Sequence, residues 1–186
     1  MSLLEIHVLG SPALRRETTP VAGVTDEHRR LIADMFETMY AAEGIGLAAP
    51  QVGRTERICV IDVENRKLAL INPEVVQREG KIKWEEGCLS IPDVYGEVQR
   101  SQHVVVRALN EQGEPFELEA SDLLAVCLQH EIDHLHGRLF IDHLSILKRR
   151  AAIAKWEKLR DQYAENRRTL TPREIAHHQT HPDEGM

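Results

Sequence analysis

The sequence predicts an α+β protein in which strands fill the middle of the chain and helices flank them. Between residues 57 and 120, short apolar runs alternate with Asn, Gly and Pro residues that are typical of turns. Apolar residues recur at helical spacing before this stretch, over 26–43, and after it, over 123–136. A third helix is expected from residue 145. With 186 residues, the chain has the size of one domain.

The first helix is expected to begin after Thr25, whose side chain can cap it, with two acids in the first turn. Leu31, Met35 and Met39 then recur every four residues and define one apolar face. Gly44 is expected to end the helix. These residues together predict an amphipathic helix.

The central stretch is expected to form a sheet region built mostly of hairpins. Its β-rich runs are 58–63, 68–71, 103–109 and 115–119. The runs are separated by turn residues such as Asn72, Pro73, Gly80 and Gly96. After them, Ser121 or Asp122 can cap the second helix.

The C-terminal part is expected to be a charged helix followed by a tail. Residues 148–168 carry eight bases and three acids, although the whole chain has a net charge of -7. We expect one domain over residues 1–168, a basic helix over about 145–168 and a flexible tail over 169–186. The tail contains His177, His178 and His181, which we interpret as solvated residues.

Composition excludes several classes of protein. Thirty acids against 23 bases argue against a surface that wraps nucleic acid. The longest wholly apolar run has six residues, whereas a membrane span needs about 20. No secretory signal is recognisable. The three cysteines show no disulfide-framework spacing, so we expect a reducing, cytoplasmic setting.

The second helix carries His130-Glu131-Ile132-Asp133-His134. Two histidines four residues apart lie on one helical face and can reach one metal ion. Glu131 is one step round the helix, so it is better placed as a general base beside water than as a ligand. The alternative is a polar, solvated helix stripe.

A hydrolytic metal site needs a third protein ligand, and Cys88 is the best candidate. It lies in Glu86-Gly87-Cys88-Leu89-Ser90, where Gly87 permits a tight turn that presents the thiol and neighbouring amides in an extended loop. Cys59 and Cys127 lie inside apolar runs and are interpreted as small buried residues.

A third segment, Gly44-Ile45-Gly46-Leu47-Ala48-Ala49-Pro50-Gln51, follows the first helix. Two glycines at this spacing allow a peptide backbone to come close. Gln51 offers an amide that can stabilise an oxyanion. The alternative is an ordinary turn at the end of a helix.

The order GIGLAAPQ, EGCLS and QHEIDH resembles the peptide deformylase family, and the likeness runs through about residues 3 to 165. It is closest to the compact bacterial form, which implies sheets, mixed or antiparallel, around a central metal-binding helix, with a long C-terminal helix. Two departures are Asp93, where glycine is common, and the segment after about 165.

The resemblance implies roles for the motif residues. Cys88, His130 and His134 would bind the metal, and Glu131 would act as the acid and base. Gln51 and the backbone N–H of Leu89 would stabilise the oxyanion. It also implies a supporting pair, formed by Glu86 and Arg100. The activity implied is metal-dependent hydrolysis of the formyl group from the formyl-methionine of new polypeptides.

An apolar pocket is expected beside the metal. Leu123, Val126 and Cys127 precede His130 by seven, four and three residues and so share its helical face. The alternative is that they belong only to the core. By resemblance, the pocket takes the methionine side chain. The expected substrate-binding residues are Ile45, Gly46, Trp84, Gly87, Leu123, Val126 and Cys127.

Metal identity follows from the resemblance rather than from ligand chemistry. Two imidazoles and one thiolate bind zinc more tightly than ferrous iron. The resemblance implies Fe²⁺ in the cell, with Zn²⁺, Ni²⁺ or Co²⁺ as substitutes in a purified sample.

Two alternative functions remain open at this stage. The histidine motif alone would suit a thermolysin-like metallo-endopeptidase, but that reading leaves Cys88 and Gln51 unexplained. A non-catalytic, metal-stabilised binding module is the other, but a structural site would close all four metal positions and need neither Glu131 nor Gln51. The expected partners are nascent formyl-methionyl peptides and, through the basic helix, the ribosome.

Overall fold

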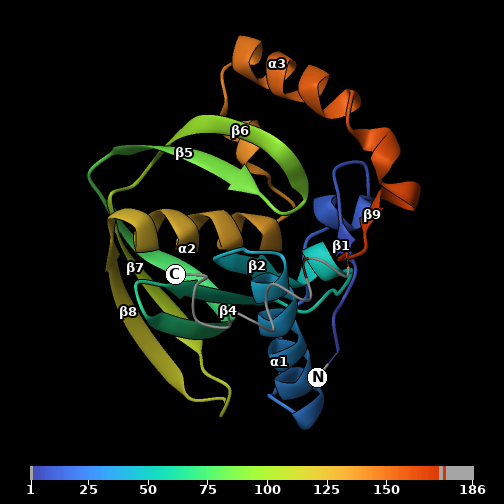
Figure 1. Ribbon diagram of the computed structural model, residues 1–186. Helices are drawn as coiled ribbons and strands as arrows, with labels where there is room; N and C mark the ends of the chain where they lie inside the picture. The colour runs from blue at the N-terminus through green and yellow to red at the C-terminus, as the bar shows by residue number, and fades with distance from the viewer. Residues whose placement is uncertain (1, 172–173, 175–186) are drawn as a thin grey trace.

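The computed structural model describes residues 2–171 and 174, which are shown in Figure 1. The α-helices are α1 Asp26–Ala41, α2 Asp122–Leu135 and α3 Ile146–Glu157. Short 3-10 helices lie at Pro12–Arg15, Ala49–Val52, Phe140–His143, Arg160–Gln162 and Ala164–Asn166. The strands are β1 Ile6–His7, β2 Gly46–Ala48, β3 Ile58–Val63, β4 Arg66–Glu79, β5 Ile82–Cys88, β6 Ile91–Arg100, β7 His103–Leu109, β8 Pro115–Ser121 and β9 Arg167–Arg168. None of the described helices is long and apolar enough to cross a membrane.

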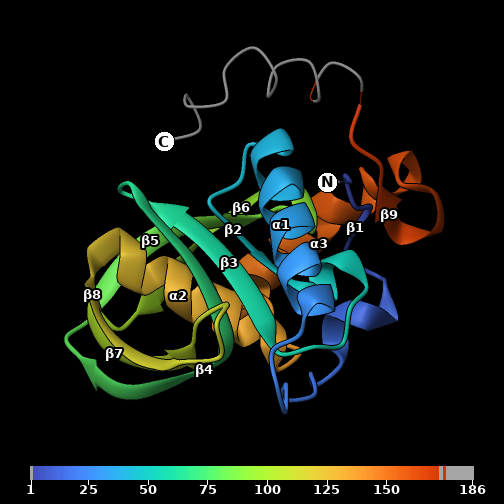
Figure 2. The ribbon, with the colours of Figure 1, turned by 90° about the horizontal axis from the view of Figure 1, so that it is seen from below.

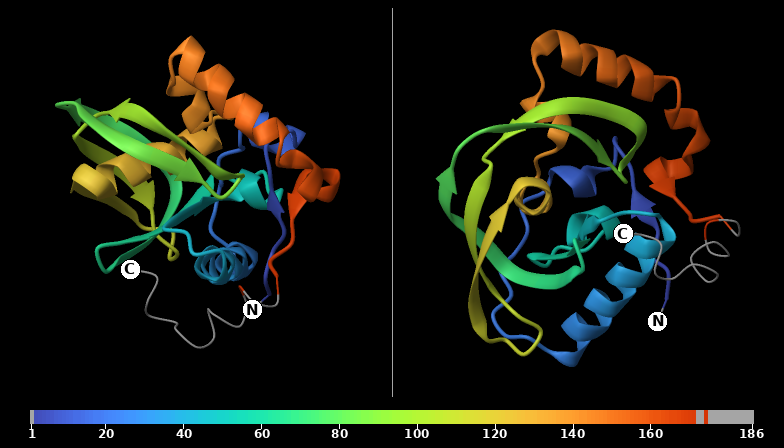
Figure 3. Two further views of the ribbon diagram at one scale, coloured as in Figure 1. Left: turned by 45° about the horizontal axis from the view of Figure 1, so that its top comes forward. Right: turned by 60° about the vertical axis from the view of Figure 1, so that its left-hand side comes forward.

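The fold is built around α2, which lies between two β structures (Figure 1). On one side is a five-stranded sheet of order β2-β3-β4-β7-β8, and on the other is the β5-β6 hairpin. All the strand pairs are antiparallel. The right-hand view of Figure 3 looks along α2 and shows strands on both sides of it. The predicted α+β fold, with sheets around a central helix, is confirmed.

Helix α2 is central, and its side chains are buried on almost every side. Ten of its 14 residues are buried, and the exceptions include Asp122 at its start and His130 in the candidate site. Leu124, Leu128 and Ile132 pack in one cluster with residues of the sheet. Burial of these apolar side chains favours the interior position of α2.

Strand β3 separates two of the apolar cores of the molecule. Cys59 and Ile61 pack in the cluster of α2, whereas Ile58 and Val60 pack in the cluster of α1. This alternation follows from the two-residue period of a strand. Met35 belongs to the α1 cluster, and Figure 2 shows α1 beside β3. The sequence therefore predicted both the position and the apolar face of α1.

Strand β4 continues past its predicted end at residue 71. Its pairing with β7 shifts register between Ile71 and Glu74 and again between Val75 and Gln77. Asn72 has a φ of 52°, and its side-chain amide exchanges two hydrogen bonds of 2.8 Å with the backbone of Val21. Such irregularities allow a strand to bend and to accommodate a proline. The Asn-Pro pair marks a bend within β4 and does not end it.

The expectation that Cys88 lies in an extended loop was wrong. Cys88 is the last residue of β5, and its partner in the ladder is Ile91 on β6. The register between Glu86 and Cys88 is irregular. Pairing with β6 stabilises the segment in a way that the polar and glycine-rich local sequence did not indicate.

The basic helix is shorter than predicted, because α3 ends at Glu157 and not near Arg168. Beyond it, Leu159 and Tyr163 pack inward against the cluster of Trp156, and the Tyr163 ring stacks on the Trp156 ring at 5.5 Å. β9 then pairs with β1. Packing and strand pairing outweigh helix propensity over this stretch, since propensities differ by less than about 1 kcal/mol per residue.

The flexible tail was predicted to begin at residue 169, but the chain is still packed against the protein there. Leu170 is buried with Ile6, Ala41 and Ala42, and the Thr169 hydroxyl donates to Glu5 at 3.2 Å. The chain is therefore packed through Leu170. Residues 172–173 and 175–186, with the three tail histidines, lie outside the described residues.

Candidate active site

Three candidate metal ligands converge where α2 passes the end of β5. His130 and His134 are one turn apart on α2, and their Nε2 atoms are 3.2 Å apart. Cys88 Sγ lies 3.4 Å from His134 Nε2, and all three ligand atoms are within 4.8 Å of one another. Two imidazoles and a thiolate that leave a fourth position open are typical of a catalytic site for a divalent transition metal. Burial lowers the pKa of His134 and favours the neutral imidazole, the form that binds metal.

Glu86 fixes the orientation of His130. Its Oε2 lies 2.8 Å from His130 Nδ1, which leaves Nε2 free to act as a ligand. The Arg100 guanidinium donates to the same carboxylate at 2.7 and 3.0 Å. Burial opposes ionisation of Glu86, but the hydrogen bonds of His130 and Arg100 outweigh it and lower its pKa to about 2. The Glu86–Arg100 pair is present and lies inside the protein.

Asp133 and His143 extend this network, and neither residue was predicted to have a role. Arg100 Nη1 is 2.6 Å from Asp133 Oδ2, and His143 Nε2 is 2.7 Å from the same oxygen. For Asp133, its position inside the histidine motif was the only sign in the sequence of a role in the site. His143 could not be found in this way, because only the fold brings residue 143 to residue 100.

Glu131 is buried against β2. Among the described side chains, its Oε2 and His134 Nδ1 are the only buried nitrogen or oxygen atoms without a hydrogen-bond partner. A Cβ at Gly46 would collide with the other carboxylate oxygen, so Glu131 occupies the space that glycine leaves. Burial raises the pKa of Glu131 to about 7. A carboxyl group with a pKa near neutrality can both accept and return a proton.

Gln51 and Leu89 lie on the other side of Cys88. The backbone N–H of Ala48 donates to Gln51 Oε1 at 2.9 Å, so the amide is held in place. Gln51 Nε2 then points to Ser90 Oγ at 3.1 Å and to Cys88 Sγ at 3.6 Å. A Cβ at Gly44 would lie 2.7 Å from Leu89 Cδ1, so this glycine lets Leu89 pack against the first motif.

Gln51, Cys88, Leu89, His130 and Glu131 line one cavity of about 960 Å³. Next to His130, its apolar lining is made by Ile45, Trp84, Leu123, Val126 and Cys127. Gly46 and Gly87 also line it, and the Tyr95 ring covers Gly87 so closely that a Cβ there would collide with it. The structure thus brings every predicted substrate-binding residue to the same cavity. Cys127 is also buried, so it belongs both to the pocket lining and to the core.

The C-terminal segment forms part of the same cavity, which the sequence did not indicate. Tyr163, Arg167, Arg168, Thr169 and Thr171 line it. These residues belong to the stretch that was predicted as the end of a helix and the start of a tail. Their exposure and polar character gave no signal that they face a cleft.

Asp93, the departure from the family pattern, also lines the cavity. Its φ of 61° is in the left-handed region, which explains why glycine is common at this position. An aspartate tolerates this conformation better than most residues do.

Comparisons with known proteins agree with this arrangement. The family model described as polypeptide deformylase matches residues 3–150. The chain is 52% identical over 161 residues to the peptide deformylase of Hydrogenovibrio crunogenus, covering 85% of this chain and 95% of the relative. The crystal structure of a peptide deformylase from Legionella pneumophila is similar with a TM-score of 0.83 and 44% identity, covering 87% of this chain and 97% of that one.

A peptide deformylase from Synechococcus elongatus, solved in complex with actinonin, is similar with a TM-score of 0.79 and 45% identity, covering 82% of this chain and 86% of that one. The family match covers more than half of the chain and includes all three motifs. The chain therefore belongs to the polypeptide deformylase family, metal-dependent hydrolases that remove the formyl group from nascent peptides.

Proposed function

We propose that this chain removes the formyl group from the formyl-methionine of newly made polypeptides with the residues of this cleft, releasing formate. The observation that carries the proposal is the convergence of Cys88, His130 and His134 beside the buried carboxylate of Glu131. Hydrolysis of a formamide needs an activated water, a stabilised oxyanion and a proton for the departing amine. Each requirement has a candidate group in the cleft.

Cys88, His130 and His134 are proposed to hold Fe²⁺, with Zn²⁺, Ni²⁺ or Co²⁺ as substitutes in a purified sample. A divalent ion held by these residues would lower the pKa of water and polarise the formyl carbonyl. Cys88→Ser should change the visible spectrum of the cobalt-loaded protein, because a hard hydroxyl replaces a soft thiolate. An unchanged spectrum would remove Cys88 from the ligand set.

Glu131 is proposed to take a proton from the attacking water and to return it to the departing amine. Its pKa of about 7 supports this role, and so does its Oε2 atom, which has no hydrogen-bond partner among the described residues. A proton acceptor and donor is most effective when its pKa lies near the working pH. Because Gly46 has no side chain, the Glu131 carboxylate fits against its backbone beside the cavity.

The Gln51 amide and the Leu89 backbone N–H are proposed to stabilise the oxyanion. Gln51 is positioned by Ala48 and points its amide nitrogen at Cys88. Leu89 follows Cys88 directly and lines the cavity. One well-placed donor of this kind is typically worth about 10² to 10³ in rate.

The apolar lining beside His130 is proposed to take the methionine side chain. Leu123 and Val126 come from α2, Ile45 precedes β2, and Trp84 lies on β5. A pocket with apolar walls and few polar groups is typical of a site that takes an apolar group of its ligand.

Formate release from formyl-Met-Ala-Ser tests the activity. The protein is loaded with ferrous iron without oxygen, and zinc-loaded protein and metal-free protein are compared with it. We expect formate only from metal-loaded samples. An unformylated peptide with internal bonds is the control, and its cleavage without formate release would favour an endopeptidase instead.

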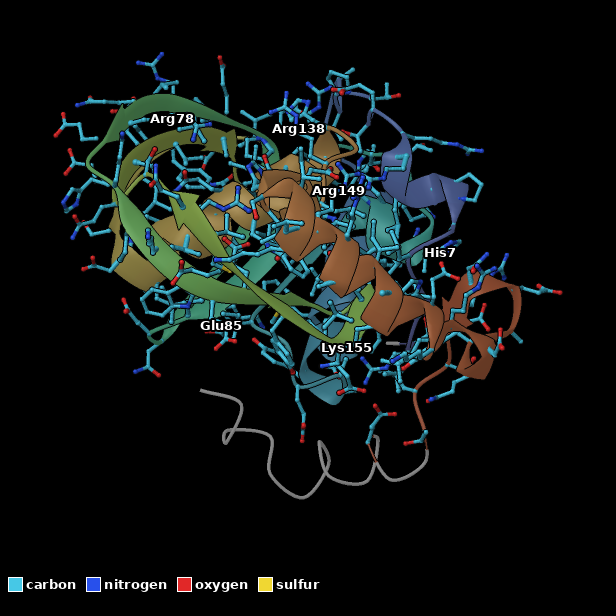
Figure 4. The ribbon with its side chains drawn as sticks, turned by 90° about the horizontal axis from the view of Figure 1, so that it is seen from above. His7, Arg78, Glu85, Arg138, Arg149 and Lys155 are labelled. Atoms are coloured by element: carbon cyan, nitrogen blue, oxygen red, sulfur yellow. The ribbon has the colours of Figure 1, made fainter. Side chains whose placement is uncertain are left out.

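Ribosome association is a second proposal, and it rests on α3. Lys148, Arg149, Arg150 and Lys155 are exposed, and Figure 4 shows Arg149 and Lys155 along α3 on one face of the molecule. Two have acidic neighbours, with Lys148 3.7 Å from Glu97 and Arg149 3.3 Å from Asp142. An exposed row of bases can bind RNA phosphates. An enzyme that acts at the ribosome in this way would be cytoplasmic.

Charge neutralisation tests this proposal better than truncation does. Removing the chain from residue 148 would delete Trp156 and Leu170, which belong to buried clusters. The variant with Lys148, Arg149, Arg150 and Lys155 changed to Gln should bind ribosomes more weakly and with a smaller salt dependence. The control carries Gln at four exposed bases elsewhere, Arg30, Arg66, Lys81 and Arg107. Equal ribosome binding by both variants would contradict the proposal.

A further inference from the structure

The cavity is larger than one methionine side chain needs. Its volume of about 960 Å³ lies at the upper end of the range of about 300–1,000 Å³ for pockets that enclose whole ligands. Besides the catalytic groups and the apolar pocket residues, it is lined by residues of the segment 163–171, which we name the C-terminal wall.

The C-terminal wall is held against the catalytic turn by backbone hydrogen bonds. The Val8 N–H donates to Asn166 O at 2.9 Å, and the Leu9 N–H donates to Ser90 O at 2.8 Å. The strand that carries Arg167 also pairs with β1. The segment after β1 therefore joins the wall to the turn that follows Cys88.

An apolar contact reinforces this attachment. Leu170 is buried in a cluster with Ile6, Ala41 and Ala42, and Leu89 packs against the same cluster. The wall thus has a buried residue in the cluster against which a proposed oxyanion residue packs, and other residues that line the cavity. It lies beyond residue 150, where the match to the family model ends.

Arg167 is the residue of the wall best suited to bind a peptide main chain. It lines the cavity, its side chain is 46% exposed, and its guanidinium pairs with Glu5 at 3.1 Å. A guanidinium has five N–H donors, so several remain for a ligand. The neighbouring Arg168 is paired with Glu174, so the wall offers no unbalanced cluster of charge.

We propose that the C-terminal wall binds the substrate residues that follow the methionine, with the Arg167 guanidinium donating to their main-chain carbonyl oxygens. This inference rests on the proposed function. Main-chain recognition suits a substrate that is any nascent polypeptide, because carbonyl oxygens are present whatever the side chains are. The wall adds affinity that grows with peptide length.

A length series tests the wall. kcat and KM are measured with formyl-Met-Ala, formyl-Met-Ala-Ser and a formyl-Met hexapeptide for the iron-loaded wild type, Arg167→Ala and Arg160→Ala. Arg160 is a matched control, because it is also an exposed arginine with one acidic partner, Glu157, at 2.9 Å, and it does not line the cavity. In parallel, calorimetry measures binding of the formyl-free Met dipeptide and hexapeptide.

For the wild type and Arg160→Ala, we expect kcat/KM and affinity to rise with length. For Arg167→Ala, the ratio of hexapeptide to dipeptide kcat/KM should fall about threefold to tenfold, mainly through KM, as the loss of one or two hydrogen bonds predicts. An unchanged ratio in both measurements, or the same fall in Arg160→Ala, would overturn the inference. Absence of formate from every substrate would contradict the proposed function, and the calorimetric comparison would still decide the role of the wall.

Discussion

Helices α2 and α3 show two opposite ways of using a helix. Ten of the 14 residues of α2 are buried, whereas only Ala152 and Trp156 are buried among the 12 residues of α3. Beside α2, Arg100 pairs with Glu86 and with Asp133 inside the protein, whereas the charged side chains of α3 face outward. The starts of both helices follow from local sequence, but α2 supplies mainly buried side chains and α3 mainly exposed ones.

The difference teaches where a polar group is costly. A buried group without a partner destabilises the fold by about 1–3 kcal/mol, so it persists only where a ligand or a reaction uses it. The unpartnered Glu131 oxygen is such a group. An exposed charge on α3 costs almost nothing, so its presence there says less about function.

The largest expected effect comes from Glu131→Gln. This change keeps the shape of the side chain and removes its ability to carry a proton, so kcat/KM should fall about 10²- to 10⁴-fold. Metal content, measured by elemental analysis, should remain that of the wild type because Glu131 is not a proposed ligand. Loss of metal together with activity would contradict the assigned role.

Arg100→Leu sharpens the contrast between buried and exposed charge. It leaves Glu86 and Asp133 buried without their shared partner, so the free energy of unfolding in urea should fall by about 3–5 kcal/mol. The control is Arg107→Leu, which breaks the exposed pair with Glu117 and should cost about 0–1 kcal/mol. Equal losses in the two variants would break the comparison.

The same buried pair predicts a dependence of stability on pH. Glu86 has a pKa of about 2 in the folded protein, below its ordinary value of 4.5. The folded state therefore binds this proton less tightly than the unfolded state does. The resulting stabilisation is complete above about pH 4.5 and is lost as the pH falls towards 2. Urea midpoints across this range should depend less on pH in Glu86→Gln, and identical profiles would count against the pair.

Gly46→Ala tests the close approach of β2 to Glu131. The added Cβ would collide with the carboxylate and displace it, and a misplacement of about 1 Å can cost about 10² in rate. Gly23→Ala is the control, because no atom lies within 4 Å of a Cβ there. Formate release is measured for both, and normal activity in Gly46→Ala would show that the carboxylate is free to move.

The smallest effect is expected at the start of α3. Ile146 and Leu147 are 73% and 77% exposed, so changing both to Ser should alter the free energy of unfolding by less than about 0.5 kcal/mol each. Trp156→Ala, on the buried side of the same helix, should cost about 3–5 kcal/mol. A large loss in the Ile146/Leu147 variant would mean that this end of α3 packs against the protein in solution.

Local sequence was enough for the helices that carry clear periodicity and for the residues of the three motifs. The spacing of His130 and His134 placed them on one face, and the apolar residues of α1 faced the core as predicted. It was not enough for β5 and β6, because the stretch 82–100 lacks long apolar runs and gains its regularity from pairing. Nor could it place the end of α3, since Leu159 and Tyr163 read equally well as helical residues.

The sequence by itself determined the chemical inventory and its approximate order: a helix with two histidines and an acid between them, a cysteine beside glycine, and an amide after a glycine-rich segment. Helical geometry is local, so residues four apart meet whatever the rest of the chain does. Only the tertiary structure decided that Arg100 lies between Glu86 and Asp133, that His143 joins them, and that residues 163–171 line the cavity. These contacts join segments far apart in the chain. They form because an unpaired buried charge is costly and burial of apolar side chains is favourable, whatever the distance along the sequence between the groups involved.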